Sequence, residues 1–328
     1  MYNKDNIDQL TMDFINNRDI VKNVFSFDYS YIYPVAANVF CNAGVAADEA
    51  KLRECKKIIK KNAGFASYIK SYAFAVIASK LCVSPDPEAQ FRKIMDIYSI
   101  LKKHFSRSSY IALLSALLAE RSSVEAAENI AQRGKKLYNM MKKDHPFLTS
   151  SEDSVMACFM ALSDKDDNAL ICDAEECYKL LHKFFFSTNM VQASSHVLAV
   201  SDGAPEDKVR KMTGMFNAFK AKGRKFGSNY ELPVLAALSA INDEPESVID
   251  TVISIDNFLA SQKGYKGVLG IDKKTRLMHS AILTADLYQD PDNAEAAASA
   301  STIALIAAQE AAICAAIAAS AAAADSSN

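Results

Sequence analysis

The chain of 328 residues contains no tryptophan, only 10 glycines and only 8 prolines. So few glycines and prolines leave little room for the tight turns of an all-β protein. The seven cysteines are an odd number and form no Cys-x-x-Cys pair, which favours a reducing compartment over a disulfide framework. No His-Glu-x-x-His or Gly-x-Ser-x-Gly signature occurs. These absences favour a non-enzymatic protein without a cofactor.

Charge and hydrophobicity narrow the class further. The formal net charge is −2 and half of the residues, 50%, are hydrophobic. A balanced charge gives no sign of a nucleic-acid partner, which needs a basic excess or patch. The first six residues contain no apolar stretch behind a basic start, so no secretory signal is recognised. We expect a globular, cytoplasmic protein with no membrane span.

A phenylalanine returns about every forty residues. Each is followed by a polar turn, an apolar helical run, a break, and an amphipathic run that is often closed by lysines. Such a period is typical of stacked helical hairpins of the HEAT or armadillo type. Each recurrent aromatic is expected to anchor a junction between hairpins. The six are Phe27, Phe65, Phe105, Phe147, Phe185 and Phe226.

The pattern predicts an all-α fold, either an open α-solenoid or a closed α/α toroid. A helical-repeat domain is expected over 1–290, preceded by an amphipathic helix and followed by an Ala-rich helix with a frayed end over 291–328. The predicted units are 27–64, 65–104, 105–146, 147–184, 185–225, 226–266 and a degenerate 267–290.

Helix-start signals support this register. Pro-Glu pairs at 87, 205 and 245 are expected to open three amphipathic helices, since proline suits the first helical position. Pro34 and Pro233 each lie seven residues after a recurrent phenylalanine and should fall in the first turn or two of a helix. Thr149 and Glu152 have the spacing of a capping box.

The alanine-rich segment from Ala294 to Ala324 predicts a long helix, because alanine has the highest helix propensity. Three interpretations are open: docking on the last hairpin, self-association through its small-residue face, or a membrane span. Glu310 would cost about 2–3 kcal/mol near the centre of a bilayer. Docking is therefore favoured and a span is the least favoured.

The segment 164–175 offers a candidate metal site. Its oxygen-bearing side chains occupy positions 1, 3, 5 and 12 of an EF-hand loop, but Ala169 replaces the glycine expected at position 6. The alternative is a loop whose Asp and Asn cap the following helix. The candidate calcium ligands are Asp164, Asp166, Asn168 and Glu175.

A glycine cluster with basic residues after it offers a candidate anion site. Glycines followed by cations at a helix start can bind an anion, but the spacing matches neither a Walker loop nor a dinucleotide fingerprint. The alternative is a flexible junction where the repeat degenerates. The candidate residues are Gly267, Gly270, Lys273, Lys274 and Arg276.

Three segments together resemble a bacterial family known as domain of unknown function 4003: 147–157 (FLTSSEDSVMA), 194–199 (SSHVLA) and 230–235 (YELPVL). The alanine-rich tail is similar too, and the resemblance covers about residues 10–320. It implies a bacterial, intracellular, all-helical protein. It implies no particular activity and carries no catalytic residues over.

Taken together, the sequence predicts a non-enzymatic helical-repeat scaffold that binds a protein partner along its stacked surface. One alternative is an α/α-toroid enzyme with a central pocket, although no acidic or metal-binding motif for it is found. Another is a calcium- or anion-responsive binding module built on one of the two candidate sites.

Overall fold

The computed structural model describes residues 4–26, 32–64, 68–71, 73–226, 231–266 and 271–288. Within these ranges the chain is all-helical, with 14 α-helices, one 3-10 turn and no strand. The predicted all-α class is therefore confirmed. Phe27, Phe65, Gly267, Gly270 and the alanine-rich tail lie outside the described residues.

The helices follow one another through short connections. Their bounds are α1 (Lys4–Val24), α2 (Ile32–Asn42), α3 (Glu49–Asn62), η1 (Tyr68–Lys70), α4 (Phe74–Val83), α5 (Pro87–His104), α6 (Ser109–Arg121), α7 (Val124–Asp144), α8 (Asp153–Met160), α9 (Asp167–Leu181), α10 (Thr188–Val200), α11 (Pro205–Ala221), α12 (Glu231–Ala240), α13 (Pro245–Ser261) and α14 (Lys273–Leu287).

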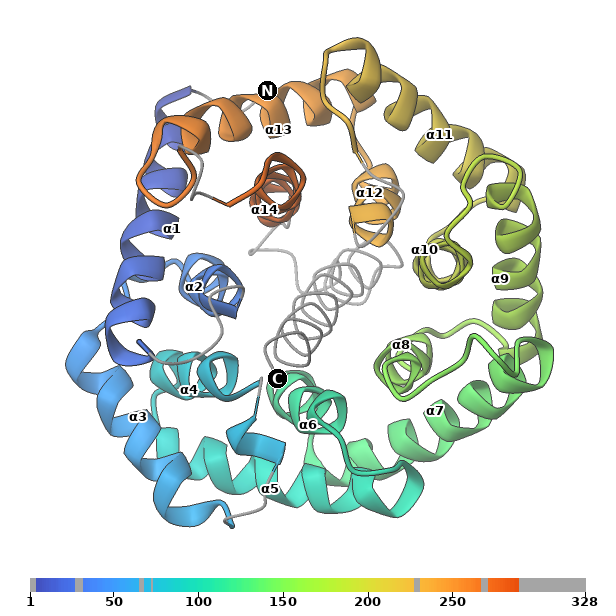
Figure 1. Cartoon of the computed structure of the whole chain (residues 1–328). Helices are drawn as coiled ribbons and strands as arrows, with labels where there is room; N and C mark the ends of the chain where they lie inside the picture. Colours follow the sequence, from blue (N-terminus) through green and yellow to red (C-terminus); the bar gives the residue numbers. More distant parts are fainter. Residues whose placement is uncertain are drawn as a thin grey trace, which may run out of the picture. The chain divides into compact units, whose positions relative to one another are not determined.

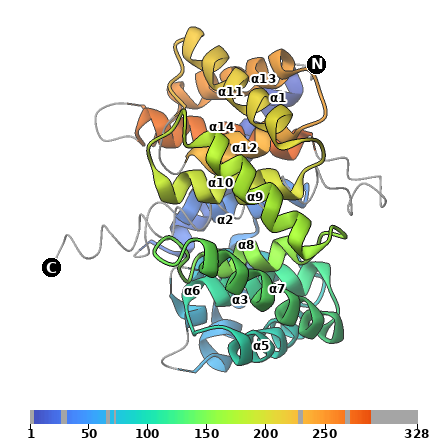
Figure 2. The same ribbon diagram turned by 90° about the vertical axis from the view of Figure 1, so that its right-hand side faces the viewer.

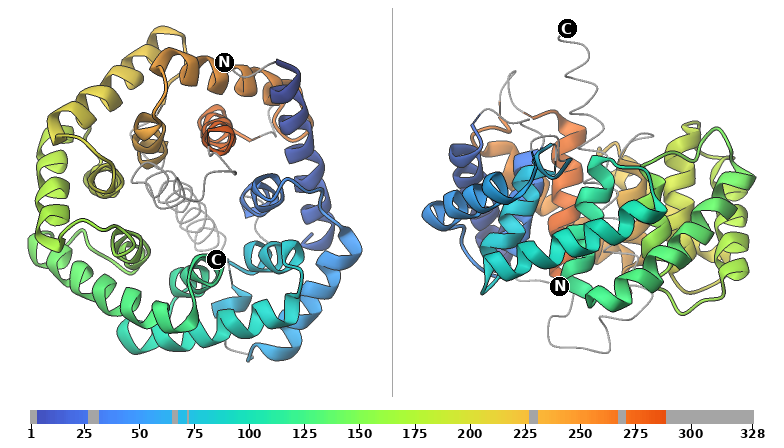
Figure 3. Two further views of the ribbon diagram at one scale, coloured as in Figure 1. Left: turned by 180° about the vertical axis from the view of Figure 1, so that it is seen from behind. Right: turned by 90° about the horizontal axis from the view of Figure 1, so that it is seen from below.

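Contacts divide the described chain into two compact units. One contains 12–138 and 150–161, and the other contains 4–11, 139–149 and 162–288. In the unit that ends at 288, α10, α12 and α14 lie beside one another, with α9, α11 and α13 packed against them (Figures 1 and 2). In the unit that starts at 12, α2, α4, α6 and α8 form a similar row, with α3 and α5 against it (Figure 3).

The even-numbered helices are buried almost all round, whereas the odd-numbered ones are buried along a stripe. In α6, 10 of 13 residues are buried, and in α12, 9 of 10. In α5 only five of 18 are buried: Phe91, Ile94, Ile97, Tyr98 and Leu101. Ile97 and Tyr98 are adjacent, and the others recur every three residues along the helix, which places all five on one face. Burial of each such side chain contributes about 1.5–3 kcal/mol. The core therefore consists of the even-numbered helices and the buried stripes of the odd-numbered helices.

The helix-start signals predict most boundaries correctly. Pro87, Pro205 and Pro245 are the first residues of α5, α11 and α13. Pro34 and Pro233 are each the third residue of a helix, α2 and α12. A proline in the first turn sacrifices no intrahelical hydrogen bond, because the first N–H groups have no partner.

The capping box at Thr149 and Glu152 does not form. The Thr149 hydroxyl accepts a hydrogen bond from Gln192 Nε2 at 3.1 Å instead. The carboxylate of Asp153 accepts from the backbone N–H of Ser150 at 2.7 Å, one residue out of the expected register. Glu152 stands at the N-cap with no side-chain bond to the helix. The prediction was wrong because Asp153, and not its neighbour Glu152, provides the carboxylate that accepts the backbone bond at this helix start.

Basic side chains on or just before four odd-numbered helices, α3, α7, α9 and α11, reach the carboxyl end of the even-numbered helix that follows. Cations are favoured there, since the last carbonyls lack intrahelical donors and carry the negative end of the helix dipole. The bonds run from Lys51 Nζ to Ser84 O (3.0 Å), Arg133 Nη1 to Ala161 O (3.1 Å), Lys165 Nζ to Ala199 O (3.0 Å) and Lys211 Nζ to Ile241 O (2.7 Å).

One glycine allows two helices to approach closely. A Cβ on Gly134, in α7, would lie 2.6 Å from the Sγ of Cys158 in α8. Glycine inside a helix costs about 1 kcal/mol relative to alanine. Here the missing Cβ leaves space for a fully buried thiol, and burial raises the pKa of Cys158 well above its usual range.

The recurrent phenylalanines do not all anchor junctions. Phe105, Phe185 and Phe226 are 7%, 3% and 3% exposed, but Phe147 is 99% exposed. For Phe147 the expectation is wrong. The backbone N–H that closes α7 belongs to His145, which bonds the carbonyl of Met141 at 2.9 Å. Phe147 therefore lies two residues beyond the closing position and points away from the core.

Candidate interaction surface

The buried ring at the end of an odd-numbered helix packs against an aromatic ring of the next odd-numbered helix. Phe105 meets Tyr138 edge-on at 5.9 Å between centroids, and Phe185 meets Phe216 edge-on at 5.1 Å. Edge-to-face pairs of this kind add about 0.5–1.5 kcal/mol beyond the area they bury. These contacts fix each loop that follows an odd-numbered helix against the neighbouring helix.

His145 takes the matching place between α7 and α9. Its ring lies 4.5 Å from that of Tyr178, which is itself 5.5 Å from His182. Nε2 of His145 is 2.5 Å from Oε1 of Glu175. The imidazole thus combines a ring contact with a polar bond. As a result the loop after α7 is held beside the carboxyl-terminal half of α9.

Three phenylalanines project from the two loops that this junction holds. Phe147, in the loop after α7, is 99% exposed, and Phe184 and Phe186, in the loop after α9, are 59% and 91% exposed. We call these three residues the aromatic face. The other exposed large hydrophobic residues of the described chain, Met12, Val45 and Tyr68, are 38–48% exposed. The most exposed apolar side chains are therefore concentrated on two successive loops.

The two loops and the helix ends beside them are also rich in lysine. Residues 142–149 and 179–189 contain four lysines and one aspartate, a formal charge of +3, in a chain whose formal charge is −2. Lys142, Lys143, Lys179 and Lys183 are all exposed. We call these four the flanking lysines. This part of the surface therefore combines exposed apolar rings with positively charged side chains.

The sequence missed Phe184 and Phe186 as surface residues. Their signal is the run Phe184-Phe185-Phe186, because three consecutive rings cannot all enter one core. Phe185 is the ring turned inward, and its neighbours are turned out. A pattern that counts one phenylalanine per forty residues does not distinguish the buried ring from its exposed neighbours.

The candidate calcium ligands are placed in separate roles. Asp166 is the N-cap of α9, and its carboxylate accepts from the backbone N–H groups of Asn168 and Ala169 at 2.9 and 3.2 Å. Glu175 faces His145. Among the described residues no group of three or more His, Cys, Asp or Glu side chains is arranged to hold a metal ion.

The described residues of the candidate anion site are divided between a cap and an ion pair. Asp272 is the N-cap of α14 and accepts from the backbone N–H groups of Lys274 and Thr275 at 2.9 and 3.1 Å. Its carboxylate thereby occupies the end of the helix at which an external anion would bind. Lys273 and Lys274 are exposed.

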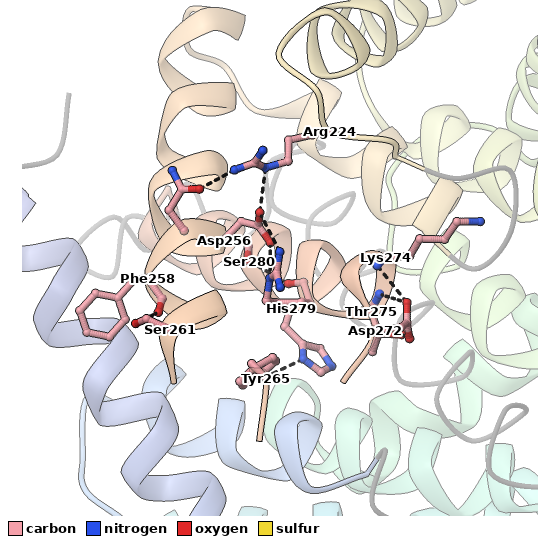
Figure 4. Close-up of polar contacts among 12 residues, drawn as sticks. Arg224, Asp256, Phe258, Ser261, Tyr265, Asp272, Lys274, Thr275, His279 and Ser280 are labelled. Carbon is pink, nitrogen blue, oxygen red and sulfur yellow. Dashed lines mark hydrogen bonds and ion pairs between the residues drawn. The ribbon is translucent and has the colours of Figure 1, made fainter. Parts of the chain in front are cut away.

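Arg276, the last residue of that candidate site, forms an ion pair with the buried Asp256. Asp256 and its second partner, Arg224, are labelled in Figure 4. Nε of Arg276 lies 2.7 Å from Oδ1 of Asp256, and Nε of Arg224 lies 2.8 Å from Oδ2. Asp256 is 1% exposed. One carboxylate between two guanidinium groups joins α13, α14 and the segment after α11. In the same view Tyr265 Oη is 2.9 Å from Nδ1 of His279.

A pocket of about 390 Å³ lies between the carboxyl ends of α10 and α12 and the first turns of α11. Lys208 and Lys211 line it. Lys208 Nζ is 2.8 Å from Oδ2 of Asp173, and Lys211 Nζ donates to Ile241 O. Desolvation lowers the pKa of Lys211. The ammonium groups of Lys208 and Lys211 therefore both have partners within the protein. The residues that line the pocket span 198–242 and form no sequence motif.

Two adjacent carboxyl groups begin α8. Burial raises the pKa of Asp153 to about 7 and also raises that of Glu152. Tyr110 Oη lies 3.5 Å from Oε2 of Glu152. The sequence interprets this acidic pair as capping groups, and the bond from Ser150 N–H to Asp153 agrees with that role.

None of the described helices has the length and apolar character needed to cross a membrane. The fold and the exposed face define an all-helical protein that offers a surface of aromatic rings and lysines. The comparisons place it more closely: the chain belongs to the family described as "Protein of unknown function (DUF4003)", which matches residues 17–311. It is also 29% identical over 225 residues to the "Uncharacterized protein YeaA" of Bacillus subtilis (strain 168), covering 67% of each chain. No solved structure matches.

Proposed function

We propose that this protein is a helical-hairpin repeat scaffold that binds another protein through the aromatic face. The observation that carries the proposal is the near-complete exposure of Phe147 and Phe186, with Phe184 also exposed, on two successive loops. Exposed apolar side chains that cluster on a soluble protein commonly mark an interaction site.

Recurring backbone geometry supports the repeat. A backbone N–H bonds the carbonyl four residues earlier at the end of each of four odd-numbered helices, α1, α3, α5 and α7. The closing residues are Phe25, Ala63, Phe105 and His145, which are 38, 42 and 40 residues apart, close to the period of the phenylalanines. His182 closes α9, and three residues later the N–H of Phe185 bonds the carbonyl of Leu181 in the same way.

The energetics favour a partner that covers all three rings. A phenylalanine side chain that passes from water into an apolar contact contributes about 1.5–3 kcal/mol. Three such rings supply the order of magnitude expected of the few dominant residues of an interface. The loop after α7 is already fixed by the His145–Tyr178 contact at 4.5 Å, and the loop after α9 by the Phe185–Phe216 contact at 5.1 Å. Binding therefore orders little additional backbone.

A photocrosslinking experiment in a bacterial host tests the proposal. A photoreactive phenylalanine analogue is placed at 147 or 186, and crosslinked proteins are identified by mass spectrometry. The matched control carries the analogue at Tyr68, which is 43% exposed and lies outside the face. We expect a protein crosslinked from 147 and 186, absent from 68, and lost when Phe184 is replaced by Ser. Identical products from all three positions would overturn the proposal.

A further inference from the structure

The charge around the aromatic face specifies what kind of partner fits it. Within the described chain Lys143, Lys179 and Lys183 form no ion pair, although all three are exposed. Glu175, a half-buried acid of α9, is turned toward His145 at 2.5 Å. Its charge is therefore already directed at another group, and the lysines keep a positive surface around the rings.

The position of the lysines has a local cause that explains only part of the pattern. Cations at the last turn of a helix are favoured by the dipole, by about 0.3–1 kcal/mol. This accounts for Lys142 and Lys143 in the last turn of α7. Lys183 lies two residues beyond the end of α9 and directly before Phe184. Lys183 is therefore adjacent in sequence to an exposed ring and is not part of the last turn of the helix.

We infer that the partner presents a segment in which aromatic or aliphatic residues are flanked by aspartate or glutamate. This inference rests on the proposed function of the aromatic face. The apolar residues of the segment would cover Phe147, Phe184 and Phe186, while its carboxylates would face the flanking lysines. Charge complementarity of this kind raises association rates and excludes basic partners.

A protein segment matches the face better than a lipid or nucleic-acid surface does. Asp144 is exposed between Lys143 and His145, and Glu176 is half-buried on α9. A continuous layer of phosphates would be repelled by these carboxylates. A peptide can place a hydroxyl or a lysine opposite them and keep its acids for the flanking lysines.

The test is a selection of random peptides displayed on phage against the immobilised full-length protein. Clones that also bind the triple variant Phe147→Ser, Phe184→Ser, Phe186→Ser are removed first. We expect the remaining clones to be enriched in Asp and Glu beside aromatic or aliphatic residues. The tightest peptide, with a fluorescent label, should lose about tenfold in affinity to the variant Lys143→Glu, Lys179→Glu, Lys183→Glu.

The matched control is Lys57→Glu, Lys60→Glu, Lys61→Glu, three exposed lysines of α3, which should leave the affinity within twofold. Phenylalanine-dependent clones without acidic enrichment would overturn the inference and leave the proposed function standing. No phenylalanine-dependent clone at all would count against both. Phenylalanine-dependent binding to vesicles of phosphatidylglycerol, with no peptide selected, would overturn the inference in favour of a lipid surface.

Discussion

Phe105, which follows the last residue of α5, and Phe147, which follows α7, hold matching places in the forty-residue pattern, yet Phe105 is 7% exposed and Phe147 is 99% exposed. After α5 the closing N–H belongs to the phenylalanine itself, whereas after α7 it belongs to His145. Two additional residues shift the ring out of the junction. In these two loops the backbone bond that ends the helix, rather than the residue type, determines whether the phenylalanine enters the core.

The largest expected effect comes from truncating the two rings. Phe105→Ala should cost about 3–5 kcal/mol in the free energy of unfolding, because it removes a buried ring and leaves a cavity. Phe147→Ala should stay within about 0.5 kcal/mol of the original chain, since its ring is in water. Urea unfolding followed by circular dichroism measures both. Equal losses for the two variants would contradict the comparison.

A second contrast concerns the helices that follow these loops. α6 begins at a neutral cap, in which Ser108 Oγ accepts from Ile111 N–H at 3.3 Å. α8 begins with Asp153, whose pKa burial raises to about 7 from an ordinary 3.8. The folded state therefore keeps a proton that the unfolded chain releases above pH 4, so this residue lowers stability as pH rises from about 4 to 7.

Asp153→Asn should remove that pH dependence. Between pH 4 and pH 8 the original chain is expected to lose about 3–4 kcal/mol more unfolding free energy than the variant. Urea unfolding at several pH values gives the difference, and Ser108→Ala serves as a control with a constant offset. Parallel pH curves for Asp153→Asn and the original chain would show that the carboxyl group titrates normally.

A smaller effect is expected at the junction between α7 and α9. His145→Ala removes the bond to Glu175 and the ring contact with Tyr178, and should cost about 2 kcal/mol. His182→Ala, at an exposed position on the other side of Tyr178, should cost less than about 1 kcal/mol. Thermal unfolding of the two variants side by side is sufficient. A larger loss for His182→Ala than for His145→Ala would show that His182, and not His145, holds the junction between α7 and α9.

Helix type and helix starts could be predicted from the sequence because their causes are local. Proline at a first turn, lysine at a last turn and the spacing of Phe91 and Ile94 each depend on neighbours within one or two turns. The closing residue of α7 could not be predicted in this way. His145 is selected by contacts with Tyr178 and Glu175, which lie 33 and 30 residues further along the chain.

The candidate sites show the same division. The cap formed by Asp166 was among the alternatives that the residues suggested, since Asp before a helix is a common cap. The pairing of Arg276 with Asp256 was not, because it depends on α13 and α14 packing together. The aromatic face was missed for a related reason. A sequence pattern identifies apolar residues, but only tertiary packing determines which of them remain in water.

Four bonds from basic side chains to the carboxyl ends of even-numbered helices share one direction along the chain. Lys51, Arg133, Lys165 and Lys211 each precede the carbonyl that they bind by about thirty residues. On a ribosome, each of these cations therefore emerges before its acceptor has been made. At these four places the cation lacks its carbonyl partner until the even-numbered helix that follows has been translated, so the contact is completed only as translation continues.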